Sequence, residues 1–177
     1  MTLAPTTIIP VGPRQVVLQI DDGGFERYFS VARGTDGYYV NRITPASYPA
    51  TLKAVQLYFG IDGPQAGTHL SVVTAANPSG AAELGPLGIR ATDKWLPGTA
   101  RFVDYPVPEM TITSGDFLVG FAMNYEGEFG VVPVDTTEPR DRSYVSLNGV
   151  NFVRAGQSAG SPNGNFAIRA IVSVSGQ

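Results

Sequence analysis

Acidic side chains gather on a glycine-containing turn near the start of the chain, and one arginine near its end could meet them. Asp21, Asp22 and Glu26 lie within the stretch IDDGGFE. Carboxylate oxygens on a turn are ligands that Ca²⁺ prefers, so these residues are a candidate calcium site, although their spacing does not match an EF-hand. The favoured alternative is an ion pair between Arg169 and this turn, with Asp22 as the expected partner, because an unpaired guanidinium in an apolar strand is costly to bury.

A second acidic group follows later in the chain. Asp135, Glu138 and Asp141 are interspersed with Arg140 and Arg142. Acidic and basic residues at such short separations favour a locally salt-bridged loop over a metal site. We therefore expect this segment to be structural.

Catalytic chemistry has little support in the residue types present. His69 is the only histidine, and the chain has no cysteine. A Ser-His-Asp triad needs a serine activated by histidine, and zinc sites usually need two or more histidine or cysteine ligands. We expect a non-catalytic protein in which His69 is a half-exposed structural residue. A glycosidase carboxylate pair, which requires a separation of roughly 5–9 Å, stays open as a third hypothesis.

Aromatic residues offer a different chemistry, the packing of a sugar ring against an aromatic face. Trp95, Tyr125 and Tyr58 are the candidates for such a ligand-binding surface. Trp95 lies in the irregular segment ATDKWLPG, where anchoring of a loop is favoured over an exposed contact, and Tyr125 lies at the end of a predicted strand.

Composition sets the fold class. The 177 residues fit one domain, with 43% hydrophobic and only 15% charged residues, and 21 glycines and 14 prolines punctuate the chain. No segment keeps a helical apolar period over three turns, so the protein is predicted to be all-β. A net charge of −3 argues against nucleic-acid binding. No apolar run approaches the ~20 residues of a membrane-spanning helix, so no membrane insertion is expected.

The last predicted strand, residues 165–175, organises the expected sandwich. Its alternate positions form one continuous apolar face, Phe166, Ile168, Ala170, Val172 and Val174. The first strand is predicted at 15–20, directly before the acidic turn. An ion pair between that turn and Arg169 would bring the two ends of the chain together.

The remaining segments alternate between apolar strands and turn residues. Together they predict about ten strands in a two-sheet antiparallel sandwich of jelly-roll type. Residues 1–14 are predicted to be a flexible arm or linker, and residues 15–177 a single domain. The other strands are expected at 38–43, 51–60, 68–76, near 89, 101–107, 117–123 and 127–134, with a hairpin at 142–154 around Asn148-Gly149.

The chain resembles the β-sandwich accessory modules of secreted multidomain bacterial proteins, often found beside subtilisin-like proteases. The resemblance covers residues 18–174 and implies a non-catalytic extracellular role, with no ligand that carries over. It rests on segments that occur in the same order: DDGGFE at 21–26, YYVNRITP at 38–45, YPATLKAVQLYFG at 48–60, SGDFLVGF at 114–121, DTTEPRDRSYVS at 135–146 and NFAIRAIV at 165–172.

These observations lead to two main functional hypotheses. The first is an extracellular, non-catalytic binding or docking module for a polysaccharide, a cell surface or a neighbouring catalytic domain, without a cofactor other than the candidate calcium. The second is a self-assembling jelly-roll subunit, a homo-oligomer of a surface layer or shell. An exposed cluster of Trp95 with other aromatic residues on one sheet would favour sugar binding, and a flat aliphatic patch would favour protein docking.

Overall fold

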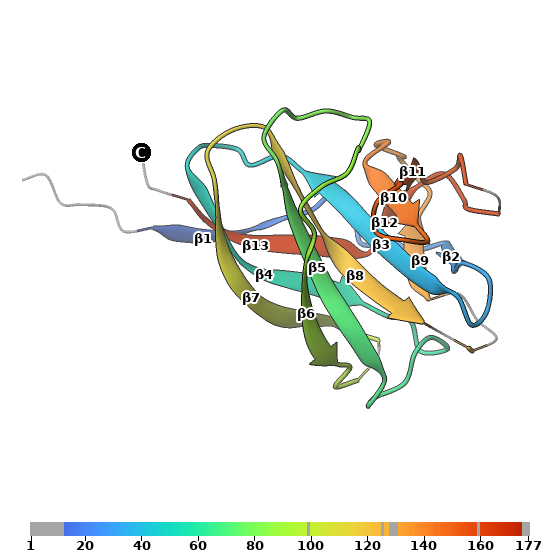
Figure 1. Ribbon diagram of the computed structural model, residues 1–177. Helices are drawn as coiled ribbons and strands as arrows, with labels where there is room; N and C mark the ends of the chain where they lie inside the picture. Colours follow the sequence, from blue (N-terminus) through green and yellow to red (C-terminus); the bar gives the residue numbers. More distant parts are fainter. Residues whose placement is uncertain (1–12, 99, 125, 128–130, 159, 175–177) are drawn as a thin grey trace, which may run out of the picture.

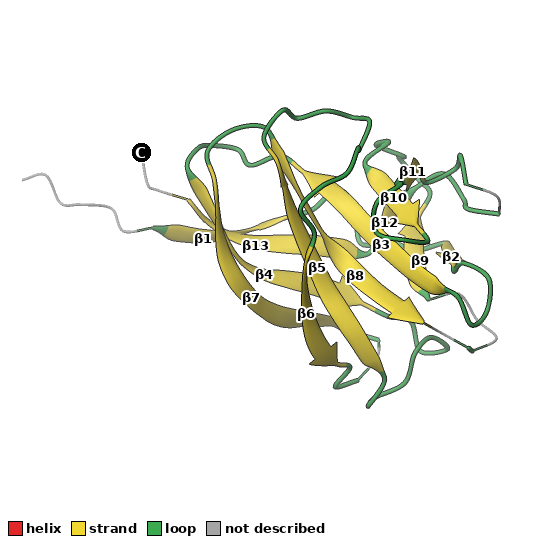
Figure 2. Cartoon of the chain, viewed as in Figure 1, coloured by secondary structure: helices red, strands yellow, loops and turns green. Residues whose placement is uncertain are grey.

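The computed structural model describes residues 13–98, 100–124, 126–127, 131–158 and 160–174, which form β-strands joined by turns and loops (Figures 1 and 2). None of this described part forms a helix that could span a membrane. Its 13 strands are β1 Arg14–Leu18, β2 Arg27–Phe29, β3 Asp36–Ile43, β4 Ala50–Tyr58, β5 His69–Asn77, β6 Arg90–Trp95, β7 Phe102–Ile112, β8 Asp116–Asn124, β9 Val132–Asp135, β10 Ser143–Ser146, β11 Val153–Arg154, β12 Asn165–Phe166 and β13 Ile168–Val174.

Two antiparallel sheets form the sandwich. One has the strand order β1-β13-β4-β7 and the other β11-β10-β3-β8-β5-β6, while β12-β9-β2 form a smaller third sheet. Most strands that are neighbours in a sheet are not consecutive in the chain, as in a jelly roll. The predicted sandwich is confirmed. The strand count was too low because the three-residue strand β2 was not predicted, and because the predicted last strand forms two strands, β12 and β13.

The two ends of the described chain pair directly. Strand β1 runs antiparallel to β13, from Arg14 opposite Val174 to Leu18 opposite Ala170. The predicted last strand is divided at Ala167, because residues 165–166 pair with β9 and the remainder pairs with β4. Most of the predicted arm, residues 1–12, lies outside the described residues, and β1 begins one residue earlier than expected.

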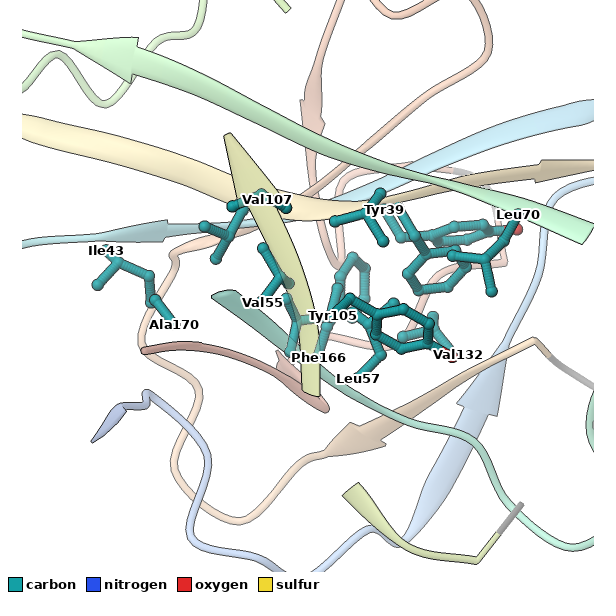
Figure 3. Packing of buried hydrophobic residues seen from close by; sticks show 14 of the residues in the cluster. Tyr39, Ile43, Val55, Leu57, Leu70, Tyr105, Val107, Val132, Phe166 and Ala170 are labelled. Atoms are coloured by element: carbon teal, nitrogen blue, oxygen red, sulfur yellow. The ribbon is translucent and has the colours of Figure 1, made fainter. Parts of the chain in front are cut away.

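The main core lies between the two large sheets and is rich in aromatic residues (Figure 3). Tyr39 stacks on Phe121 with ring centroids 5.0 Å apart, and Phe59 meets Phe121 edge-on at the same distance. The Tyr39 hydroxyl accepts a hydrogen bond of 3.0 Å from the Val31 amide. This central packing fixes β3 against β8, and therefore the shape of the six-stranded sheet.

A second, smaller core covers half of the outer face of the six-stranded sheet. The loop of residues 78–89 crosses this face and inserts Leu84 among Val40, Val73 and Leu118, which point away from the main core (Figure 1). The hydroxyl of Tyr144 donates to the carbonyl of Ala82 at 2.7 Å and holds the loop down. The loop does not cover the other half of this face.

Candidate functional site

The uncovered half of the outer face presents a row of side chains from four adjacent strands. We call it the open face. Strand pairing places His69 directly opposite Trp95, Ser71 opposite both Asp93 and Ala122, and Ala122 opposite Tyr38. Because side chains two residues apart on a strand share a face, all of these point outward together. The open face consists of Asp36, Tyr38, His69, Ser71, Asp93, Trp95, Ala122 and Asn124.

A shallow depression of about 380 Å³ lies in the open face. Ala122, which lies between Tyr38 and Ser71 in the sheet register, contributes only a methyl group to its floor. It is lined by Asp36, Tyr38, Thr68, His69, Ser71, Ala122, Met123 and Asn124. Apolar ring surface and hydrogen-bonding groups therefore occur together around one hollow, as ligand sites require.

Trp95 stands at the rim of this face with 66% of its surface exposed. The His69 ring meets its indole edge-on, with centroids 5.0 Å apart and an interplanar angle of 66°. The interpretation of Trp95 as a buried loop anchor is wrong, because the residue ends the edge strand β6 with its side chain on the solvent side. One face of a positioned indole is thus available to a ligand.

Ser71, His69 and Asp93 are the residue types of a serine-hydrolase triad, but their contacts differ from one. Ser71 Oγ donates to Asp93 Oδ1 at 2.9 Å, and His69 Nε2 lies 3.5 Å from the same oxygen. In a triad the histidine accepts the proton of the serine, whereas here the aspartate accepts it. These groups form a polar surface beside Trp95.

The other predicted aromatic residues do not join Trp95. Tyr58 lies on the outer side of the four-stranded sheet, half-buried, with its ring centroid 5.1 Å from that of Phe25 and 5.4 Å from that of Phe102. Tyr125 lies outside the described residues. His69 was not predicted to lie beside Trp95, and only the register between β5 and β6 could have placed it there.

The acidic turn forms the predicted ion pair, with a different partner. Arg169 Nε donates to Asp21 Oδ2 at 3.1 Å and a second nitrogen bonds Oδ1, while the guanidinium lies 3.9 Å from the centre of the Phe102 ring. The expected partner, Asp22, was wrong. Its carboxylate instead accepts a hydrogen bond of 2.7 Å from the Gly24 amide and closes the turn.

The three candidate calcium ligands do not converge on one point. Asp21 binds Arg169 and Asp22 caps the turn, while Glu26 accepts a hydrogen bond of 2.8 Å from the Thr136 amide. Among the residues that the structure describes, no group of three or more His, Cys, Asp or Glu side chains could hold a metal ion. Asp21, Asp22 and Glu26 are therefore not arranged as a shared calcium site.

The second acidic group is only partly the expected salt-bridged loop. Glu138 pairs with Arg140 at 3.6 Å, but Asp141 pairs with Arg154 from the neighbouring hairpin. Asp135 is 1% exposed and accepts hydrogen bonds from the side-chain amide of Asn165 and the backbone amides of Thr137 and Asp22, at 2.9–3.1 Å. Asp135 therefore links the acidic turn to the last part of the chain.

No protein-family model matches the chain, and no curated protein matches it either. Among solved structures, it is similar to the crystal structure of the cysteine protease and lectin-like domains of Cwp84, a surface layer associated protein of Clostridium difficile. The TM-score is 0.60 at 14% sequence identity, over 80% of this chain and 32% of the other. The fold therefore resembles part of that structure, which includes a lectin-like domain.

At this level of identity the likeness establishes the fold alone. In fold, it agrees with the expected resemblance to a β-sandwich accessory module of secreted multidomain bacterial proteins. The association with subtilisin-like proteases is not confirmed, since the protease named with this neighbour is a cysteine protease.

Asp135 should make the stability of this β-sandwich depend on pH. Burial acts to raise its pKa, but the hydrogen bonds from Asn165, Thr137 and Asp22 outweigh burial and hold the pKa below its ordinary value of 3.8. Because the pKa of Asp135 is lower in the folded state than in the unfolded state, its ionised form stabilises the folded protein above about pH 3.8. This contribution is lost as the pH falls through the folded-state pKa.

We therefore expect the free energy of unfolding to decrease as the pH is lowered from neutral to below about pH 3.8. Urea unfolding at a series of pH values measures it. Asp135→Asn should cost about 1–3 kcal/mol at neutral pH, because it leaves buried amide donors poorly paired. The free energy of unfolding of this variant should also decrease less steeply at acid pH than that of the unmodified protein. An equally steep decline in the variant would mean that other groups control it.

Proposed function

We propose that this protein is an extracellular, non-catalytic module that binds carbohydrate on the open face. The observation that carries the proposal is the exposed indole of Trp95, positioned by His69 beside a hollow with polar walls. Sugar rings pack their apolar faces on indole while their hydroxyl groups bond to neighbouring polar side chains. The similarity to a structure that includes a lectin-like domain of a surface layer associated protein supports both the ligand class and the location.

Docking to another protein is a second candidate, favoured by a separate surface. Leu147, Val150 and Val153 are exposed on the hairpin that joins β10 and β11, beside a shallow hollow of about 290 Å³. Exposed apolar patches of this kind mark interaction sites. Such a patch would suit either of two partners, a neighbouring catalytic domain or a second copy of this chain.

Thermal unfolding against a panel of soluble neutral and charged polysaccharides tests carbohydrate binding. A ligand that binds only the folded state raises the unfolding midpoint by mass action, so at least one glycan should raise it by a few degrees at saturation. The glycan should be recovered intact, since cleavage would favour the hydrolase hypothesis. If no glycan raises the midpoint, carbohydrate binding is refuted and docking becomes the better explanation.

A further inference from the structure

The charges around the open face point to a narrower ligand class. We propose, building on the proposed function, that this face prefers glycans bearing a free, protonated amino group over their acetylated or carboxylate-bearing counterparts. Asp36 on β3 and Asp93 on β6 flank the hollow from opposite sides. The residues that line the hollow include no lysine or arginine.

Neither carboxylate is neutralised by a strong cation within the described part of the chain. Asp93 contacts the Ser71 hydroxyl and His69, and Asp36 forms no ion pair among the described residues. Lys94 follows Asp93 directly, but it pairs in register with Leu70, whose side chain lies in the main core, and so it belongs to the opposite face of β6. The open face thus presents negative charge without a nearby basic side chain of its own.

The spacing of the strands places these charges within reach of a bound sugar. Asp93 lies two residues before Trp95 on the same face of β6, a separation of about 7 Å along the strand. A substituent on a ring packed against the indole can therefore approach the Asp93 carboxylate. Asp36 lies on β3, three strands from Trp95, a separation of roughly 14 Å across the sheet. It would therefore meet a different ring of an oligosaccharide that crosses the strands.

The expected selectivity is modest because both carboxylates are exposed. An ion pair at such a position strengthens binding by about two- to fivefold, so the two together should give an amine-bearing glycan about a four- to 25-fold advantage over the acetylated form. A glycan with carboxylate groups should bind worse than a neutral one, because like charges repel. The advantage should shrink as salt screens the charges.

Calorimetric titration with a matched pair of sugars tests this inference. The probes are a β-1,4-linked glucosamine tetramer and its fully N-acetylated form, with an oligogalacturonate as the anionic probe, at mildly acidic pH where the sugar amines are charged. The free-amine tetramer should bind most tightly and the anionic probe most weakly. Asp93→Asn and Asp36→Asn should each reduce the amine preference, which is the ratio of the affinities for the two tetramers, by about two- to fivefold.

A change of pH supplies the control for charge. At mildly alkaline pH the sugar amines are neutral, so the preference should disappear. Because His69 faces Asp93, the measurement is repeated in His69→Gln, where the preference should keep the same pH dependence. Equal affinity for the two tetramers overturns the inference but leaves carbohydrate binding intact. Failure of both tetramers to bind overturns the inference too, and the polysaccharide panel then decides whether the proposed function fails with it.

Discussion

Arg169→Ala should lower the free energy of unfolding by about 3 kcal/mol or more, because it leaves a buried carboxylate without its cation. The side chain of Asp21 is completely shielded from solvent, and Arg169 bonds both of its oxygens. Arg169→Met keeps apolar contact with Phe102 but removes the charge, so it should also cost several kcal/mol. Urea unfolding at neutral pH measures both losses.

A surface ion pair provides the matched control. Lys53 and Glu109 pair across β4 and β7 with side chains 31% and 64% exposed, so Lys53→Met should cost less than about 1 kcal/mol. Combining Asp21→Asn with Arg169→Met should recover much of the loss, because no buried charge then remains unpaired. If Arg169→Met costs no more than Lys53→Met, the pair does not hold the acidic turn to β13.

Trp95→Ala should weaken glycan binding by at least about 30-fold, as expected when an aromatic residue at the centre of a contact is removed. Its effect on stability should stay within about 0.5 kcal/mol, because the indole lies at an exposed sheet edge. Leu147→Ala is the control, a comparably exposed apolar residue outside the open face, and should bind glycan normally. Equal binding by the two variants would place the sugar elsewhere.

The sequence predicted the architecture well because a strand with one buried side alternates between apolar and polar residues. The last strand shows this most clearly, since its predicted apolar positions Phe166, Ile168, Ala170 and Val172 are all fully buried. The same logic required an acidic partner for Arg169. It could not choose between Asp21 and Asp22, because they are adjacent residues and the glycines that follow allow either to turn toward β13.

The open face was harder to predict because it depends on two long-range features. One is the path of residues 78–89, which cover one half of the outer face and leave the other half uncovered. The other is the register between β5 and β6, which places His69 against Trp95. Strand β6 also lacks a buried side, and Pro97 and Gly98 follow it closely, so its sequence is typical of a loop.

The fluorescence of Trp95 gives the most direct test of carbohydrate binding on the open face, since it is the only tryptophan in the chain. In the free protein its exposed indole should emit at the long wavelengths of a solvated ring. If a sugar packs on it, titration with a glycan that raises the unfolding midpoint should shift the emission to shorter wavelength, with the same affinity as calorimetry. Binding detected by calorimetry with no change in emission would contradict the account, because the ligand would then lie away from Trp95.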